Sequence, residues 1–271
     1  MARRSPLVNV MAAAAEKAAR NLRRDFGEVE HLQVSQKGPA DFVSEADRRA
    51  EQILYTELKK GRPRFGFLME ERGEVEGEPG ESRWIVDPLD GTTNFLHGLP
   101  HWAITIAVEE RGEIVSGIVY DVLKDELFWA DKGNGAFVND QRLRVSGRST
   151  LAQSLLATGI PFMGKPDHPA FLRQLAAFTP EVAGIRRFGS ASLDLAYVAA
   201  GRYEGFWESD LQKWDIAAGI LLVREAGGFV SDLKGGAQML QNGTIIAANT
   251  HLHLPMLKIL RGAGRSADRD D

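Results

Sequence analysis

The sequence of 271 residues contains no cysteine, which excludes disulfide bonds and thiolate metal sites. It also has no apolar run that approaches the length of a membrane span. The net charge is only −4, from 33 basic and 37 acidic residues, so the broad basic surface of a nucleic-acid-binding protein is missing. The basic start at Ala2-Arg3-Arg4 lacks the apolar core of a secretory signal. We therefore expect a cytoplasmic protein with no membrane partner and no direct nucleic-acid partner.

Several catalytic motifs are missing as well. No Gly-x-x-x-x-Gly-Lys loop occurs, which argues against a kinase. The segment 189–193 does not match the Gly-x-Ser-x-Gly turn of a serine hydrolase. His97 and His101 are four residues apart, but Gly98 and Pro100 break any helix between them, so a zinc site is not indicated. A haloacid-dehalogenase-type phosphatase is disfavoured because its paired aspartates are two positions apart, whereas the pair discussed below is separated by three.

The hydrophobic pattern divides the chain into two halves without a linker. Residues 1–147 form an α+β half, which carries the first metal motifs, with helices at 7–24 and 45–60, a strand at 84–86, hairpins at 103–109/114–122 and 126–130/136–139, and a loop at 71–83. Residues 148–271 form an α/β half, which carries the last acidic motif, with strands at 154–158, 185–188, 204–207 and 243–249 and helices at 168–178, 192–200, 215–226 and 254–260.

The most informative segment is 84–95. Its apolar start is typical of a short buried strand, and it continues as Asp87-Pro88-Leu89-Asp90-Gly91-Thr92-Thr93. Since Pro88 takes the chain out of the sheet, the carboxylates of Asp87 and Asp90 can turn toward one point. Paired carboxylates and a free backbone carbonyl are the oxygen ligands that hard divalent cations prefer. The same residue types also form ordinary turns, so the motif alone leaves both interpretations open.

Two other acidic positions become candidate metal ligands when they are considered together with this motif. Glu70-Glu71 follows an apolar stretch at 65–69, although such a pair is usually a solvated surface. Asp215 opens an apolar helix that ends in Glu-Ala-Gly-Gly at 225–228, and taken alone it is more often a helix cap than a metal ligand. A carboxylate has several acceptor sites, so the two roles are compatible.

In this order, the Glu-Glu pair, the Asp-Pro-Leu-Asp-Gly-Thr-Thr motif and the Trp214-Asp215 helix start resemble the inositol monophosphatase family of lithium-sensitive, magnesium-dependent phosphatases. Similar features extend from about Lys37 to beyond Gly228. The resemblance implies a mixed α+β and α/β fold, the layered αβαβα sandwich of the inositol monophosphatase and fructose-1,6-bisphosphatase type. It also implies a homodimer.

The resemblance further implies two or three Mg²⁺ ions. The first ion would bind Glu70, Asp87 and the carbonyl of Leu89, and the second would bind Asp87, Asp90 and Asp215. A third, weaker ion would lie near Glu70 through waters. The expected substrate-binding residues are Asp90, Gly91, Thr92, Gly189, Ser190, Ala191, Glu208 and Asp215.

The chemistry that follows is hydrolysis of a phosphate monoester without a covalent intermediate. Metal ions offset the charge of the phosphate dianion and activate a water. Glu70, helped by the Thr92 hydroxyl, would orient and deprotonate that water, and Asp87 would bridge the ions. Lys37 to Asp41 resembles a mobile family loop near the metals, and a solvated loop charge is the equal alternative for Lys37.

The expected alcohol pocket is small or acidic, which favours inositol monophosphate because an acidic group repels a second phosphate. Inward-pointing Lys213, Arg186 or Arg187 would reverse this preference. Fructose 1,6-bisphosphate, histidinol phosphate and 3′-phosphoadenosine 5′-phosphate therefore remain alternative substrates. Some bacterial relatives associate with the transcription machinery, so a non-catalytic role with a transcription-factor protein partner is a second alternative.

Overall fold

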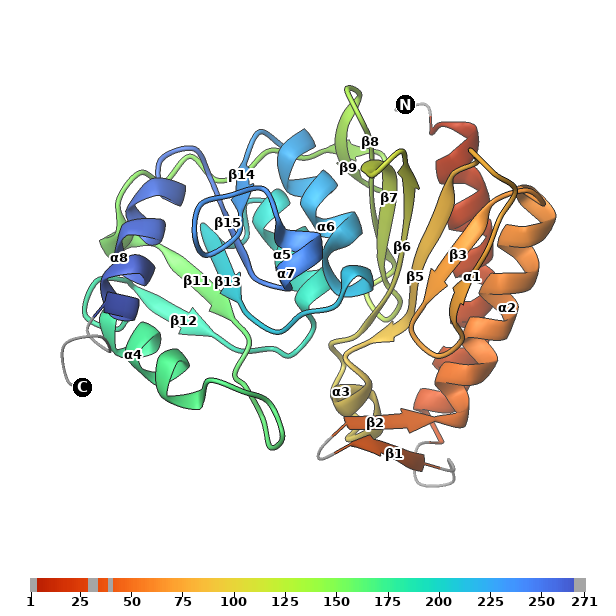
Figure 1. Ribbon diagram of the computed structural model, residues 1–271, viewed down its shortest axis with the longest axis horizontal. Coiled ribbons are helices and arrows are strands. Elements are labelled where there is room, and N and C mark those ends of the chain that lie inside the picture. Colours follow the sequence, from red (N-terminus) through yellow and green to blue (C-terminus); the bar gives the residue numbers. More distant parts are fainter. Residues whose placement is uncertain (1–3, 29–33, 39–40, 266–271) are drawn as a thin grey trace.

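The computed structural model describes residues 4–28, 34–38 and 41–265, and for 34–38, 41–44 and 265 it describes the backbone alone. The elements stack in five layers (Figure 1). In order across the molecule these are helices α1 (Pro6–Phe26) and α2 (Glu45–Gly61), an eight-stranded sheet, helices α5 (Ala191–Ala199) and α6 (Lys213–Glu225), a five-stranded sheet, and helices α4 (His168–Phe178) and α8 (His253–Arg265). The predicted αβαβα sandwich is confirmed.

The eight-stranded sheet has the order β10-β9-β8-β7-β6-β5-β3-β4, and only the β3–β5 pair is parallel. Its strands are β3 (Gly66–Met69), β4 (Gly73–Val75), β5 (Arg83–Asp90), β6 (Ala103–Glu110), β7 (Glu113–Asp121), β8 (Glu126–Asp131), β9 (Gly135–Val138) and β10 (Gln141–Arg142). Both predicted hairpins are present, as β6–β7 and β8–β9. The prediction of a loop over 71–83 was wrong at β4, a three-residue edge strand too short to show a period.

The five-stranded sheet has the order β12-β11-β13-β15-β14. Its strands are β11 (Leu155–Thr158), β12 (Gly184–Arg186), β13 (Gly205–Glu208), β14 (Phe229–Ser231) and β15 (Ile245–Ala248). β11 runs parallel to β12 and β13, whereas β15 is antiparallel to β13 and β14. The remaining elements are β1 (Val34–Gly38), β2 (Asp41–Ser44), α3 (Thr92–Leu96), a 3₁₀ turn (Leu151–Gln153) and α7 (Met239–Asn242).

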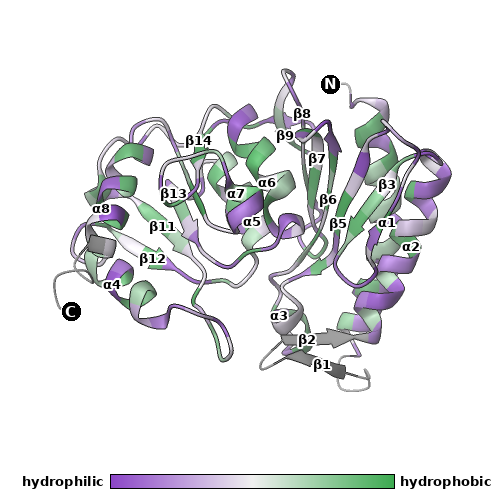
Figure 2. Cartoon of the chain, viewed as in Figure 1, coloured by the Kyte–Doolittle hydropathy of each residue, from purple (hydrophilic) through white to green (hydrophobic). Residues whose placement is uncertain are grey.

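Helices α5 and α6 form the central layer and are apolar on nearly all sides, because a sheet covers each face. Close packing fixes α6 on the larger sheet: a Cβ at Gly117 of β7 would lie 3.0 Å from the Cα of Ala218 in α6. Outer helices α1 and α2 instead present hydrophilic residues to solvent (Figure 2). Within the part of the chain that the structure covers, no helix is both long enough and apolar enough to cross a bilayer.

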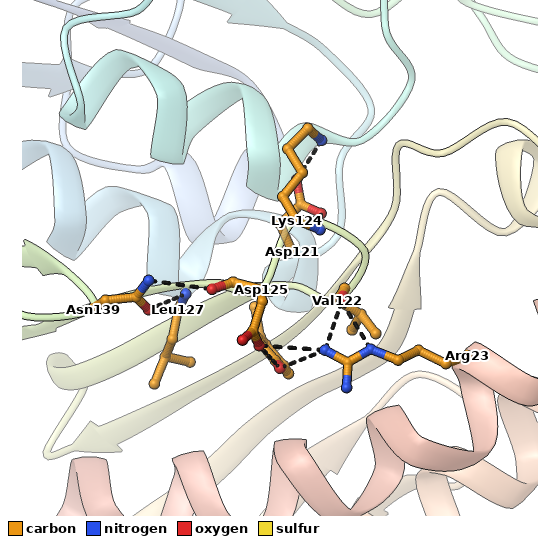
Figure 3. Close-up of polar contacts among 8 residues, drawn as sticks. Arg23, Asp121, Val122, Lys124, Asp125, Leu127 and Asn139 are labelled. Carbon is orange, nitrogen blue, oxygen red and sulfur yellow. Dashed lines mark hydrogen bonds and ion pairs between the residues drawn. The ribbon is translucent and has the colours of Figure 1, made fainter.

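The turn between β7 and β8 is tied to α1 by hydrogen bonds (Figure 3). The Arg23 guanidinium donates to the carbonyl of Val122 through Nε at 3.0 Å and Nη2 at 2.8 Å. The Asn139 side chain donates to the carbonyl of Asp125 at 3.2 Å, which supports the positive φ of 55° at that residue. The Arg23 bonds hold α1 against the sheet, and the Asn139 bond fixes the turn itself.

Candidate active site

Strand β5 carries Asp87 into the junction between the eight-stranded sheet and the α5–α6 layer. Pro88 has no N–H group to donate to a neighbouring strand, and the β5–β6 register shifts between Asp87 and Asp90, so that Pro88 and Leu89 stand opposite one residue of β6. The Leu89 N–H donates to Asp87 Oδ1 at 2.8 Å. Asp87 is only 2% exposed, so its carboxylate is held in place and removed from water.

The chain then turns at Gly91 into helix α3. Gly91 has a φ of 94°, and a Cβ there would lie 3.1 Å from the carbonyl oxygen of His101, so both conformation and space require glycine. The Thr92 hydroxyl lies 3.0 Å from the carbonyl of Leu89 and 3.1 Å from Asp47 Oδ1. Sequence reasoning missed Asp47 as a site residue, because an acid in the first turn of α2 is ordinary helix chemistry.

Glu70 lies directly beyond strand β3. Its N–H donates to the carbonyl of Val86 at 3.3 Å, which extends the parallel β3–β5 pairing by one residue and places Glu70 beside Asp87. The turn that follows is fixed by Glu51 of α2, whose Oε2 accepts the N–H of Glu71 at 2.8 Å. Glu51 is 4% exposed and is a second positioning acid that the sequence did not reveal.

Asp215 is the third residue of α6, which begins at Lys213 and not at Asp215 as predicted. The N–H of Gln212 donates to Asp215 Oδ2 at 2.7 Å, the reciprocal bond of a capping box. The cap uses one carboxylate oxygen, and the other keeps its acceptor capacity.

Electrostatics shows that these acids act on one another. Burial raises the pKa of Asp87 well above its usual range, and the nearby charges of Glu70, Asp90 and Asp215 raise it further. Burial, followed by the charge of Asp90, does the same for Asp215. Burial also raises the pKa of Asp90, although hydrogen bonds from Ser190 oppose the shift. Four carboxyl groups from β3, β5 and α6 therefore lie close enough to repel one another.

This donor set fits a hard divalent cation, because it is all oxygen, acidic and largely withdrawn from water. Among the described residues, no three His, Asp or Glu side chains already have the arrangement that holds an ion.

The start of α5 is held against the Asp90 segment. Asp90 Oδ2 accepts from Ser190 Oγ at 2.6 Å, from the Ser192 N–H at 2.8 Å and from the Ser192 hydroxyl. Asn94 Nδ2 donates to the carbonyl of Phe188 at 2.7 Å. Predicted pocket residues Gly189, Ser190 and Ala191 are thus brought to the acidic cluster, whereas the parts played by Ser192 and Asn94 were missed.

Glu208 ends strand β13, and its carboxylate lies directly over Gly159, where a Cβ would stand 1.7 Å from Oε1. Burial, followed by the charge of Asp90, raises the pKa of Glu208 to about 8, while Arg187 and Lys165 oppose the shift. Two cations therefore act on the carboxylate that is predicted to contact the alcohol. Sequence reasoning had named Arg187 as a residue that could point inward, and it had not considered Lys165.

Lys37 belongs to β1, but its side chain lies outside the described part of the structure, as do Pro39 and Ala40. Its role in the predicted loop stays a prediction.

Asp87 is buried and Glu70, Asp90 and Asp215 are partly exposed at the junction between the layers. Such a group of carboxylates is suited to divalent cations of the kind that assist phosphoryl transfer. The model of the inositol monophosphatase family matches residues 3–263. The chain belongs to this family of phosphatases.

Similar proteins cover almost the whole chain. An inositol-1-monophosphatase of Mesorhizobium japonicum is 58% identical over 95% of this chain and 97% of its own length. The Nus factor SuhB of Pseudomonas aeruginosa is 44% identical over 94% and 96%. The crystal structure of the extragenic suppressor protein suhB from Bartonella henselae superposes with a TM-score of 0.92 at 57% identity, covering 94% of this chain and 98% of that one.

Proposed function

We propose that this protein is a magnesium-dependent phosphatase that hydrolyses inositol monophosphate to inositol and phosphate. The observation that carries the proposal is that Glu70, Asp87, Asp90 and Asp215 lie close enough at one junction of the layers to raise the pKa of Asp87 and Asp215. Placing four like charges together costs free energy unless a cation offsets them. Similarity to a curated inositol-1-monophosphatase supports the substrate.

In this proposal Glu70, Asp87 and the carbonyl of Leu89 would hold one Mg²⁺, and Asp87, Asp90 and Asp215 would hold another. A third, weaker ion would lie near Glu70 through waters. When bound, the ions offset the phosphate charge and make a water more acidic.

The protein's own groups then orient the reactants. Glu70 accepts the proton of the attacking water. The Thr92 hydroxyl keeps that water in line, and the Asp47 carboxylate, 3.1 Å from the hydroxyl, holds the Thr92 hydroxyl in turn. The backbone N–H groups of Gly91 and Thr92 bind the phosphate. On the alcohol side, Ser190, Ala191 and Glu208 contact the substrate hydroxyls.

The substrate assignment is tested by a panel at fixed Mg²⁺. We expect kcat/KM to be highest for inositol 1-phosphate and activity to disappear when Mg²⁺ is chelated. Fructose 1,6-bisphosphate is the sharpest competitor, because Arg187 and Lys165 act on Glu208 and offer charge to a second phosphate. Histidinol phosphate and 3′-phosphoadenosine 5′-phosphate complete the panel. A higher kcat/KM for either bisphosphate would overturn the preference for a monophosphate.

Lithium is expected to inhibit the enzyme, because Asp90 and Asp215 supply the second ion position that lithium is thought to occupy in related phosphatases. Initial rates are compared in lithium and sodium chloride at equal ionic strength. Inhibition is expected within about tens of millimolar, since a monovalent ion binds carboxylate sites weakly. Equal rates in the two salts would contradict an intact second position.

We also propose a homodimer, in keeping with the family resemblance, which light scattering on the purified protein tests. Several relatives are named Nus factor SuhB, and this favours a second candidate function, protein contact with the transcription machinery. The test is co-purification of RNA polymerase complexes with both the wild type and an inactive variant. Failure of both proteins to retain the complexes would remove this candidate.

A further inference from the structure

Asp90 accepts hydrogen bonds from Ser192, a residue that belongs to none of the motifs. Ser192 lies 102 positions further along the chain, in the first turn of α5. It donates twice to one oxygen of Asp90, through its N–H at 2.8 Å and through its hydroxyl. We propose that the Ser192 hydroxyl is a positioning residue, which aims the free oxygen of Asp90 at the second metal ion. This inference rests on the proposed function.

The geometry separates the two oxygens of Asp90. Three hydrogen bonds to this carboxylate end on Oδ2, and Ser190 supplies the third at 2.6 Å. The backbone N–H of Ala191 also donates to the carboxylate. Three donors occupy the lone pairs of Oδ2, so Oδ1 is the oxygen that has acceptor capacity left for an ion. The carboxylate plane is thereby fixed with Oδ1 available to an ion. Hydrogen bonds of this kind to a ligating carboxylate tune metal affinity.

Burial makes the contact rigid. Ser192 is 0% exposed, so water cannot replace its hydroxyl, and the helix start leaves the side chain little rotational freedom. The backbone N–H of Ser192 alone would still cap the helix, because a carboxylate at an N-terminus accepts such bonds. The Ser192 hydroxyl adds a direction to those of the Ser192 N–H and the Ser190 hydroxyl, and so restricts the rotation of the Asp90 carboxylate further.

A second buried serine–aspartate pair provides a control that distinguishes positioning of a metal ligand from stabilisation of the fold. Ser116 is also 0% exposed, and its hydroxyl donates to Asp131 Oδ1 at 2.6 Å. The chemistry is the same, but Asp131 lies at the end of β8 and contacts the N-terminus of α1 through Ser5. Ser116→Ala therefore removes a buried serine–aspartate bond outside the candidate active site.

The experiment is calorimetric titration of the metal-free protein with MgCl₂ in the absence of substrate, with thermal unfolding measured on the same samples. Ser192→Ala is expected to weaken Mg²⁺ binding by about 10-fold or more, the usual effect of removing a group that orients a ligand. Ser116→Ala is expected to bind Mg²⁺ as the wild type does. Ser192→Cys keeps a donor at this position, although the thiol is larger than the hydroxyl and donates more weakly, so an intermediate affinity is expected. This variant serves if the alanine variant does not fold.

Equal Mg²⁺ affinity in the wild type and the Ser192 variants, with only the thermal stability lowered, would show a helix cap and overturn the inference. A wild type that neither binds Mg²⁺ nor hydrolyses phosphate esters would instead reject the proposed function itself. Kinetics adds an independent readout: the Mg²⁺ concentration for half-maximal rate rises in Ser192→Ala, while KM for substrate at saturating Mg²⁺ stays near its wild-type value.

Discussion

Asp87→Asn is expected to reduce kcat by at least about a thousandfold while the fold survives. In the proposed site Asp87 is the one side chain that both ions share. A bound ion contributes several kcal/mol to the transition state, and each 1.36 kcal/mol is worth a factor of ten in rate. Asparagine has nearly the same volume, so the variant loses a charge without opening a cavity.

The metal-free variant is expected to be at least as stable as the metal-free wild type. Burial and three neighbouring acids raise the pKa of Asp87, so its charged form costs stability above the unfolded pKa of about 3.9, and this cost grows as pH rises toward the folded pKa. A neutral side chain removes that cost. Thermal unfolding at neutral pH with a chelator present measures the difference in stability between the variant and the wild type.

Asp131→Asn is the matched control for charge loss. Asp131 is also largely buried, but it bonds Ser5 and Ser116 outside the site. Its variant should keep kcat near the wild-type value, even if it unfolds at a lower temperature. Near-normal turnover of Asp87→Asn at saturating Mg²⁺ would remove Asp87 from the metal site.

Local patterns predicted most of the architecture because each long element carries its own period. The helix predicted at 168–178 has the bounds of α4, and the predicted helix at 45–60 is α2 with one more residue. Strands β4 and β14 were not predicted. Each has three residues, which is too few to show an alternating pattern. They form strands because they pair with β3 and β15, respectively.

The residues of the candidate site were also predicted only in part. The acids with strong local context, such as Asp87 after an apolar strand, were found from the sequence. The residues that orient them were not, because their partners are remote: Thr92 meets Asp47 across 45 positions, and Ser192 meets Asp90 across 102. A single serine in an apolar helix gives no sequence signal of such a contact, because the contact depends on how the layers pack in the folded protein.

Gly159→Ala is expected to damage recognition of the alcohol without damaging the metal chemistry. A Cβ at residue 159 would lie 1.7 Å from Glu208 Oε1, so the carboxylate must move away. Because the displaced atoms are the end of a flexible side chain, the backbone can stay in place. In assays run above its pKa of about 8, Glu208 is charged, and hydrogen bonds to a charged group are worth about 1.5–3 kcal/mol. At such a pH we predict a loss of about 10- to 100-fold in kcat/KM for inositol 1-phosphate.

A substrate without hydroxyls on its leaving group separates this effect from general damage. Hydrolysis of p-nitrophenyl phosphate does not use the Glu208 contact, so Gly159→Ala should leave that rate within about twofold, a range equivalent to less than 0.5 kcal/mol. Gly147→Ala is the control substitution, since a Cβ at Gly147 meets no atom within 4 Å. It should leave both rates unchanged.

A double-mutant cycle then ties the loss to Glu208. If Gly159→Ala acts by displacing that carboxylate, adding it to Glu208→Gln should cost much less than the sum of the two single losses, because residues in contact are not additive. Additive losses would mean that the substitution at Gly159 acts through the backbone of β11. An equal fall in the rates for inositol 1-phosphate and p-nitrophenyl phosphate would also point to a change in that backbone. An unchanged kcat/KM for inositol 1-phosphate in Glu208→Gln would show that Glu208 does not contact the alcohol, and the pocket would then have to be assigned to Ser190, Ala191 and Arg187.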